Sequence, residues 1–274
     1  MDFLDFYGLK EHPFSNVVDS RFYFNSDQHS SALVKLKHAV DAKRGLSVVI
    51  GDIGSGKTTL ARKLLEELDE ERYEAALLVI IHSSVSSEWL LKKLGLQLGL
   101  EEVADGKVEL LGQLHRRLVD IDEEGKTAVV LMDEVQMLNS RELMEEFRGI
   151  LNMERAEGKM MNLIFFGLSE LEDVLSLDEP LKQRVAMRIR LQAFTEKDAH
   201  DYILHRLRVA GAARQIFTEE AIRAVRGFAG GLPRLINTIC DNALLEGFLV
   251  KAEVIDEQLV RSVAVDLALE TDLR

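Results

Sequence analysis

The sequence is poor in cysteine, in proline and in long hydrophobic runs. Its 274 residues include three prolines and a single cysteine, Cys240. A lone cysteine cannot close an internal disulfide, which fits a reducing compartment. The acidic start lacks the basic region and long apolar core of a signal peptide, and no apolar run approaches the length of a bilayer span. We therefore expect a cytoplasmic protein that contacts a membrane only through a partner.

Basic residues are also in the minority. Lysine and arginine total 34 against 47 aspartates and glutamates, which gives a formal net charge of −13. Proteins that coat nucleic acid do so largely through clustered lysine and arginine. This balance disfavours DNA as a partner, although it leaves room for a local basic patch. Hydrophobic residues make up 47% of the chain, which is enough for a globular core.

Short apolar runs alternate with longer amphipathic stretches from residue 46 to residue 191. Near-continuous apolar strands separated by helices predict a parallel β-sheet that is covered on both faces. The strands are expected at residues 46–50, 75–81, 127–132, 161–166 and 188–191, and the helices at 57–68, 88–98, 109–121 and 141–154.

The pattern changes to helices alone after Leu191. Thr195 and Thr218 have the form of helix caps, and two long helical patterns follow at residues 232–249 and 256–269. The sequence therefore predicts a small helical region after the α/β region.

We accordingly expect two domains. Residues 1–192 would form the α/β domain, and residues 193–274 would form the helical domain. The first thirty residues are rich in aromatic side chains, which predicts an ordered N-terminal arm because disordered tails are poor in aromatics.

Residues 51–58 match the phosphate-binding pattern G-x-x-x-x-G-K-[ST], between an apolar strand and a helix as the motif requires. Glycines let the backbone turn its N–H groups inward, and the helix N-terminus adds its unpaired N–H groups and positive dipole end. Lys57 would place a charge at the β- and γ-phosphates, and the Thr58 hydroxyl would bind Mg²⁺. The residues expected around the nucleotide phosphates are Gly51, Asp52, Ile53, Gly54, Ser55, Gly56, Lys57, Thr58 and Thr59.

A second apolar strand, residues 127–132, ends in Asp133 and Glu134. This is the Walker B arrangement, in which the aspartate holds the Mg²⁺ shell and the glutamate polarises the attacking water as general base. An acid directly after the aspartate favours hydrolysis over transfer to a second substrate. Asp133 is therefore our candidate for the metal, and Glu134 is our candidate for catalysis.

Four segments, taken in order, resemble the ExeA-like AAA+ ATPases, also called general secretion pathway protein A-type ATPases. They are the opening FYGLKEHPFS at 6–15, the phosphate-loop and Asp-Glu motifs, and the late GGLPRLIN at 230–237. The resemblance runs over nearly the whole chain. It implies a P-loop NTPase (AAA+) fold, with a parallel five-stranded sheet, flanking helices and a C-terminal helical lid. It further implies that ATP and Mg²⁺ bind between the sheet and the lid.

The resemblance implies roles for residues outside these motifs. Pro13 and Phe14 match the segment that packs near the adenine, although ordinary aromatic packing of the arm is an equal alternative. Pro233 and Arg234 match the sensor 2 motif, in which an arginine of the lid reaches the phosphates.

Two arginines match the family's arginine finger, which completes the site of a neighbouring subunit. Arg184 is the first candidate and Arg188 the second, with surface ion pairs as the alternative for both. A finger that acts in trans implies a homo-oligomer, either a ring or a filament.

One segment departs from the family pattern. Relatives commonly read Gly-Gln-Pro-Glu-Leu after the fourth strand, with the glutamine as sensor 1, whereas residues 167–171 read Gly-Leu-Ser-Glu-Leu. Leu168 cannot orient a water by hydrogen bonding. Either Ser169 takes the sensor 1 role or the role is weakened, which bears on catalytic rate more than on nucleotide binding.

Three functions are compatible with these residues. The first is an ATPase that assembles or regulates an envelope, secretion, pilus or polysaccharide-export system, at the inner membrane through a protein partner. The second is a DNA-dependent ATPase of transposition, and the third is a nucleotide-gated switch with low turnover. Full-length secretion ATPases of this family continue into a membrane segment and a periplasmic domain. This chain ends at Arg274 without either, and we expect no direct membrane insertion.

Overall fold

The computed structural model describes residues 2–155 and 158–269. Their contacts divide them into two compact units, each with its own hydrophobic core. The sheet unit contains residues 27–52 and 57–191. The helical unit contains the described residues up to Ser26, the loop Ile53–Gly56 and the described residues from Gln192 onward.

Five parallel strands form the sheet of the sheet unit, in the order β2-β3-β6-β1-β7. This confirms the parallel five-stranded sheet expected from the alternating sequence pattern. The strands are β1 (Leu46–Gly51), β2 (Tyr73–Val79), β3 (Thr127–Asp133), β6 (Met161–Gly167) and β7 (Val185–Leu191). Every residue of the central strands β1, β3 and β6 is buried, as near-continuous apolar runs require.

The second strand begins and ends two residues before its expected place. β2 pairs with β3 from Tyr73 opposite Thr127 to Val79 opposite Asp133. Ile80, which follows, is buried and still donates to the Asp133 carbonyl at 3.0 Å, whereas Ile81 is 78% exposed. Apolar composition alone could not show this, because the register is set by the partner strand.

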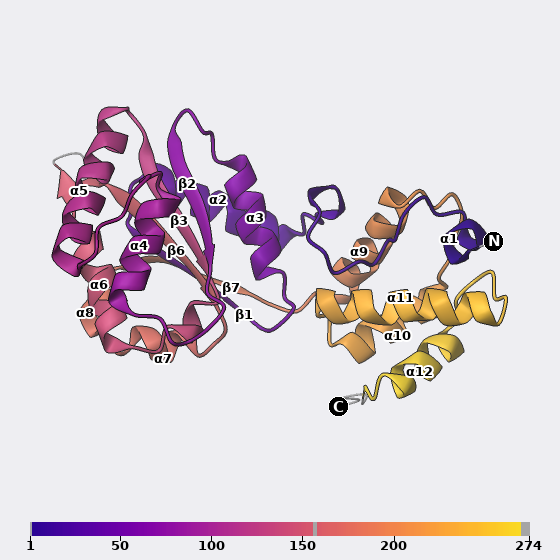
Figure 1. Ribbon diagram of the computed structural model, residues 1–274. Helices are drawn as coiled ribbons and strands as arrows, with labels where there is room; N and C mark the ends of the chain where they lie inside the picture. The colour runs from indigo at the N-terminus through magenta and orange to yellow at the C-terminus, as the bar shows by residue number, and fades with distance from the viewer. Residues whose placement is uncertain (1, 156–157, 270–274) are drawn as a thin grey trace. The chain divides into compact units, whose positions relative to one another are not determined.

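Helices cover both faces of the sheet (Figure 1). One face is covered by α2 (Asp27–Asp41) and α3 (Lys57–Glu67), which contact each other and the strands. The other face carries a cluster of helices that pack on one another and share one core. These are α4 (Ser87–Gln97), α5 (Lys107–Glu123), α6 (Arg141–Leu151), α7 (Leu171–Leu175) and α8 (Glu179–Lys182).

Two small features of the sheet unit were not expected from the sequence. A two-stranded antiparallel ladder joins β4 (Glu154–Arg155) to β5 (Gly158–Lys159). A 3-10 turn, η2 (Val135–Met137), follows β3 directly. Neither has enough residues to give a periodic pattern.

The helical unit consists of helices around a separate core. Its elements are α1 (Phe3–Tyr7), the 3-10 turn η1 (Ser20–Phe22), α9 (Glu196–Val209), α10 (Glu219–Ala229), α11 (Pro233–Leu249) and α12 (Glu257–Asp266). Both expected caps are present: Thr195 forms a capping box with Asp198, and the Thr218 side chain accepts from the backbone of Ala221. The thiol of Cys240 is fully buried in this core, and burial raises its pKa.

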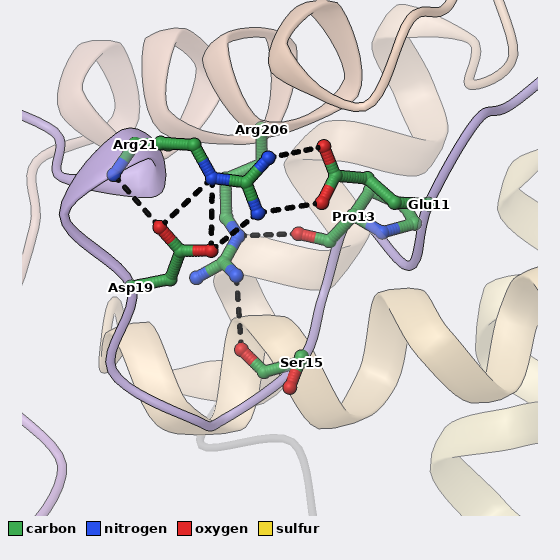
Figure 2. Close-up of polar contacts among 6 residues, drawn as sticks. All are labelled: Glu11, Pro13, Ser15, Asp19, Arg21 and Arg206. Carbon is green, nitrogen blue, oxygen red and sulfur yellow. Dashed lines mark hydrogen bonds and ion pairs between the residues drawn. The ribbon is translucent and has the colours of Figure 1, made fainter.

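The N-terminal arm packs within the helical unit, whereas we expected it in the α/β domain. Arg206 of α9 is 6% exposed and donates from Nε to the Pro13 carbonyl at 2.5 Å and from Nη2 to the Ser15 carbonyl at 2.9 Å (Figure 2). Its guanidinium also lies over the Phe22 ring, 4.9 Å from the centroid. This buried arginine, hydrogen-bonded to two backbone carbonyls, fixes the path of the arm. The expected boundary at residue 192 therefore holds for the C-terminal segment of the helical unit, but the N-terminal arm also belongs to that unit.

A second arginine, Arg21 of the arm itself, forms ion pairs on the surface of the arm. Arg21 pairs with Glu11 at 2.8 Å and with Asp19 at 2.6 Å (Figure 2). These groups are exposed to solvent, which screens their attraction. The inner arginine, Arg206, therefore carries more of the arm's stability than the outer one.

Among the helices formed by residues 2–155 and 158–269, none combines the length and the apolar character needed to cross a membrane.

Candidate phosphate and metal site

The phosphate-binding loop lies between the central strand β1 and helix α3. β1 is hydrogen-bonded to β6 on one side and to the edge strand β7 on the other, so the loop leaves the sheet from an interior strand. Gly54 and Gly56 have φ of +78° and +98°, a region that side chains rarely adopt. The two glycines therefore give the loop the tight turn that an anion-binding backbone needs.

Lys57 is fixed against this loop. Its side chain belongs to the first residue of α3, is 6% exposed, and donates from Nζ to the carbonyls of Gly51 at 2.8 Å and Asp52 at 2.9 Å. The ammonium is thus placed at the helix N-terminus, where the dipole and unpaired N–H groups already favour an anion.

Ser55 supplies a buried hydroxyl to the same loop. It is 1% exposed, and its Oγ has no hydrogen-bond partner in the described parts of the chain. A buried polar atom without a partner is uncommon and requires an explanation. A phosphate oxygen would satisfy it, so the loop residues fit a nucleotide.

Asp133 and Thr58 meet from elements far apart in the sequence. The Thr58 hydroxyl of α3 donates to Asp133 Oδ2 at the end of β3, at 2.5 Å. Asp133 is 1% exposed, and burial first, then the charge of Glu134, raises the pKa of its carboxyl. A divalent cation would offset this cost of burying a negative charge, and a carboxylate with a hydroxyl is a donor set that Mg²⁺ accepts.

No group of three or more His, Cys, Asp or Glu side chains gathers as a metal site among the residues that the structure describes. This is compatible with Mg²⁺, which usually keeps several waters and binds through one or two carboxylates plus substrate phosphates. The Thr58 and Asp133 pair would therefore hold the ion together with a nucleotide.

Glu134 directly follows Asp133, the last residue of β3, at the point where the chain leaves the sheet. Its backbone is left-handed, with φ of +61° and ψ of +34°, and its N–H donates to Asp133 Oδ1 at 3.0 Å. A non-glycine residue in this region is uncommon and occurs often at functional sites.

Gln136, which the sequence analysis missed, contacts Glu134 directly. Its Nε2 donates to Glu134 Oε2 at 2.5 Å, and its Oε1 accepts from the backbone N–H of Leu168 at 3.2 Å. In the sequence, Gln136 follows Glu134 by two residues. This spacing alone does not predict the contact, because the contact depends on the turn η2 and on the pairing of β3 with β6.

Ser169, the expected sensor 1 residue, is exposed, and its hydroxyl donates to Glu170 at 3.1 Å. The structure shows no hydrogen bond between Ser169 and Glu134 within the described ranges. The backbone of the preceding residue, Leu168, makes the link to this part of the site instead.

The Gly-Gly-Leu-Pro-Arg segment joins two helices of the helical unit. Gly230 ends α10 in a left-handed conformation, and Pro233 is the first residue of α11. A Cβ on Gly231 would lie 2.4 Å from the Phe194 carbonyl oxygen, so only glycine fits. The Arg234 side chain is exposed, and its backbone N–H donates at 3.3 Å to Gly54 of the loop that groups with this unit.

Phe14 and Pro13 are both buried in the helical unit. Phe14 is 2% exposed and packs edge-on against Phe217, with ring centroids 6.1 Å apart. The Pro13 carbonyl accepts from Arg206. Of the two alternatives that the sequence left open for Phe14, this geometry favours core packing over a contact with adenine.

The two finger candidates differ in their partners. Arg188 pairs with Glu172 at 2.6 Å. Arg184 is exposed and donates only to the Arg148 carbonyl, at 3.4 Å, with no ion pair in the described part of the chain. Arg184 is therefore the more available cation of the two.

Comparison with known proteins shows similarity over most of the chain. Residues 40–175 match a family described as an AAA domain. The chain is 34% identical over 249 residues to general secretion pathway protein A of Aeromonas hydrophila, which covers 90% of this chain and 45% of that protein. The chain thus spans less than half the length of this relative.

Solved structures share the fold at low sequence identity. The ORC2 protein of Aeropyrum pernix, in ADPNP–ADP complexes, matches with a TM-score of 0.72 and 14% identity over 94% of this chain and 72% of that one. Cdc6p from Pyrobaculum aerophilum matches with a TM-score of 0.70 and 19% identity, over 93% and 70% of the two chains. At these identities the likeness shows the fold alone.

Proposed function

Because the chain belongs to the ExeA-like family of AAA+ P-loop ATPases, we propose that it binds ATP with Mg²⁺ and hydrolyses it. The observation that carries this proposal is the 2.5 Å hydrogen bond from Thr58 to Asp133. It joins Thr58, the last residue of the phosphate-loop motif, to Asp133, the last residue of β3. This contact supports the proposal that the two motifs, which are separate in the sequence, make up one site.

Each side chain of this site has a distinct role in the proposal. Lys57, with the backbone N–H groups of the loop, would bind the phosphates. Thr58 and Asp133 would hold Mg²⁺, which when bound neutralises charge on the phosphates. Glu134 would accept the proton of the attacking water as general base.

The helical unit is proposed to act as the lid, with Arg234 as sensor 2. The Gly-Gly-Leu-Pro-Arg segment, which places Arg234 in the first turn of α11, supports the sensor 2 role. Asp52 and Ile53 of the loop and Thr59 of α3 would contribute to the proposed phosphate site through their backbone. Adenine recognition is proposed for Pro13. Phe14 would instead stabilise the arm by packing in the core of the helical unit.

Activity is proposed to depend on assembly of several copies. Arg184 is exposed and lacks an ion pair among the described residues, so a neighbouring copy's site could use it as a finger. An arginine supplied in trans raises phosphoryl-transfer rates by roughly 10³–10⁵-fold. We propose a homo-oligomer whose hydrolysis drives or regulates a protein partner of an envelope or secretion system at the inner membrane. The name of the Aeromonas relative, general secretion pathway protein A, supports the secretion part of this proposal.

The test is ATP turnover per subunit across a wide range of protein concentration, with Arg184→Ala as the variant and Arg188→Ala as its matched control. Specific activity should rise with concentration in the wild type. It should stay low in Arg184→Ala and respond much less to loss of Arg188. A rate that is independent of concentration would remove the trans finger from the account.

Duplex DNA added in parallel decides between partners. Stimulation by DNA that disappears at high salt would favour the DNA-dependent ATPase over the secretion role. Tight ATP binding with no turnover at any concentration would favour a nucleotide-gated switch.

A further inference from the structure

The amide side chain of Gln136 joins the candidate general base to the loop after β6. We propose that Gln136 is a positioning residue, which orients Glu134 and couples it to the backbone at Leu168. This inference rests on the proposed function in one respect, namely that Glu134 is the general base.

The backbone that carries Gln136 is held firmly. Val135 and Leu138 are fully buried on either side of it. The N–H of Met137 donates to the Glu134 carbonyl at 2.9 Å, and that of Leu138 donates to Val135 at 2.9 Å. The side chain therefore extends from a fixed turn toward both of its partners.

Gly167 makes room for the amide. A Cβ at this last residue of β6 would lie 2.8 Å from Gln136 Oε1, which is closer than real Cβ contacts. A side chain at position 167 would therefore push the amide away from the loop.

The two hydrogen bonds fix which end of the amide faces Glu134. The Leu168 N–H can only donate, so it selects the amide oxygen. The amide NH₂ is then presented to the carboxylate and donates to Oε2 at 2.5 Å. One carboxylate oxygen is held by the protein, and a movement of the 167–168 backbone would be transmitted to it.

This arrangement also accounts for the departure at Leu168. A backbone N–H makes the contact, so the side chain at 168 does not need to be polar. Ser169, whose hydroxyl bonds to Glu170, is not required for the link. Gln136, and not Ser169, thus makes the contact to Glu134.

Two substitutions of Gln136 separate its two bonds. Gln136→Met keeps the length of the side chain but can neither donate to Glu134 nor accept well from Leu168. Gln136→Glu keeps an acceptor for Leu168 but loses the donor to Glu134. Ser169→Ala serves as the matched control on the neighbouring loop.

In steady-state ATP hydrolysis, both Gln136 variants should lower kcat by about 10-fold or more, with KM for ATP within about 2-fold of wild type. Ser169→Ala should change kcat by less than about 2-fold. A wild-type kcat in Gln136→Met, or a rise in KM that matches the fall in kcat, would overturn the positioning role.

Hydrogen exchange of the Leu168 amide tests the bridge without any need for turnover. Exchange should be faster by about 10-fold or more in Gln136→Met and stay near the wild-type rate in Gln136→Glu. Unchanged exchange in Gln136→Met would overturn the coupling to Leu168. If the wild type does not hydrolyse ATP but exchange responds as expected, the proposed function fails while the bridge stands.

Discussion

Asp133 shows how a single buried carboxylate links stability to pH. Burial raises the pKa of its carboxyl above the ordinary value of 3.8, so the folded protein binds this proton more tightly than the unfolded chain. Its contribution to stability is full below the unfolded pKa and is lost as pH rises through the folded pKa. At neutral pH the ionised side chain therefore destabilises the protein unless a cation is bound.

Asp133→Asn should consequently stabilise the protein at pH 7 in the absence of Mg²⁺ and nucleotide. The Thr58 hydroxyl can accept from the new amide, and the buried charge is gone. The melting temperature should rise by about 2–4 °C, the shift that about 1 kcal/mol produces in a domain of this size. The gain should shrink as pH falls toward 4, and a gain that does not vary with pH would contradict this explanation.

At the residue scale, the sequence predicted groups that form contiguous motifs. Lys57 and Thr58 lie in the expected loop, and Asp133 is close enough to Thr58 for a hydrogen bond. Gln136 was not predicted because its contacts require the left-handed turn at Glu134 and the pairing of β3 with β6. A side chain that acts through tertiary neighbours leaves no local pattern.

Among the elements, the junction between α10 and α11 depends on Gly231. This residue has φ of +76°, and a Cβ would lie 2.4 Å from the Phe194 carbonyl oxygen. Gly231→Ala should lower the free energy of unfolding by at least about 2 kcal/mol, because strain and overlap add. Denaturant titration would measure the loss.

Gly227→Ala is the matched control within α10. A Cβ there meets nothing within 4 Å, so alanine should stabilise the helix by about 0.5–1 kcal/mol. Equal effects of the two substitutions would show that close packing at Gly231 is not what requires glycine.

The N-terminal arm supplies a second test at this scale. Arg206→Met would leave the carbonyls of Pro13 and Ser15 without their buried donor, which should cost about 2–4 kcal/mol. Limited proteolysis should then cut the arm before Ser26. Arg21→Ala, which removes only exposed ion pairs, should leave both stability and cleavage near wild type. Protection of the arm in Arg206→Met would refute its anchoring by this arginine.

Elements with strong periodicity were predicted well. Elements whose bounds depend on a neighbouring strand or helix were not. The strand at residues 127–132 and the helix at 57–68 lie within a residue or two of β3 and α3. β2 differs from its prediction because strand register depends on β3. The short helices α7 and α8 are held by packing on α6, and their few residues give no helical period.

On the scale of the whole molecule, the sequence predicted the α/β region and the helical region but placed the arm in the wrong one. Residues 2–26 precede the sheet in the chain, yet their elements α1 and η1 contact α11 and α9. Composition showed that the arm is ordered, whereas its partners lie about 200 residues away. Chain order is a weak guide to packing when the N-terminal segment joins the C-terminal elements.

The central claim concerns the whole molecule as an ATPase, and Glu134→Gln tests it most directly. The substitution keeps the shape of the side chain and an acceptor for Gln136 but removes the base. Measured side by side, Mg²⁺-ATP turnover should fall by about 100-fold or more, while ATP affinity stays within about 3-fold of wild type. A variant that hydrolyses ATP at the wild-type rate would contradict the account, as would a wild type that binds ATP without turnover at every protein concentration.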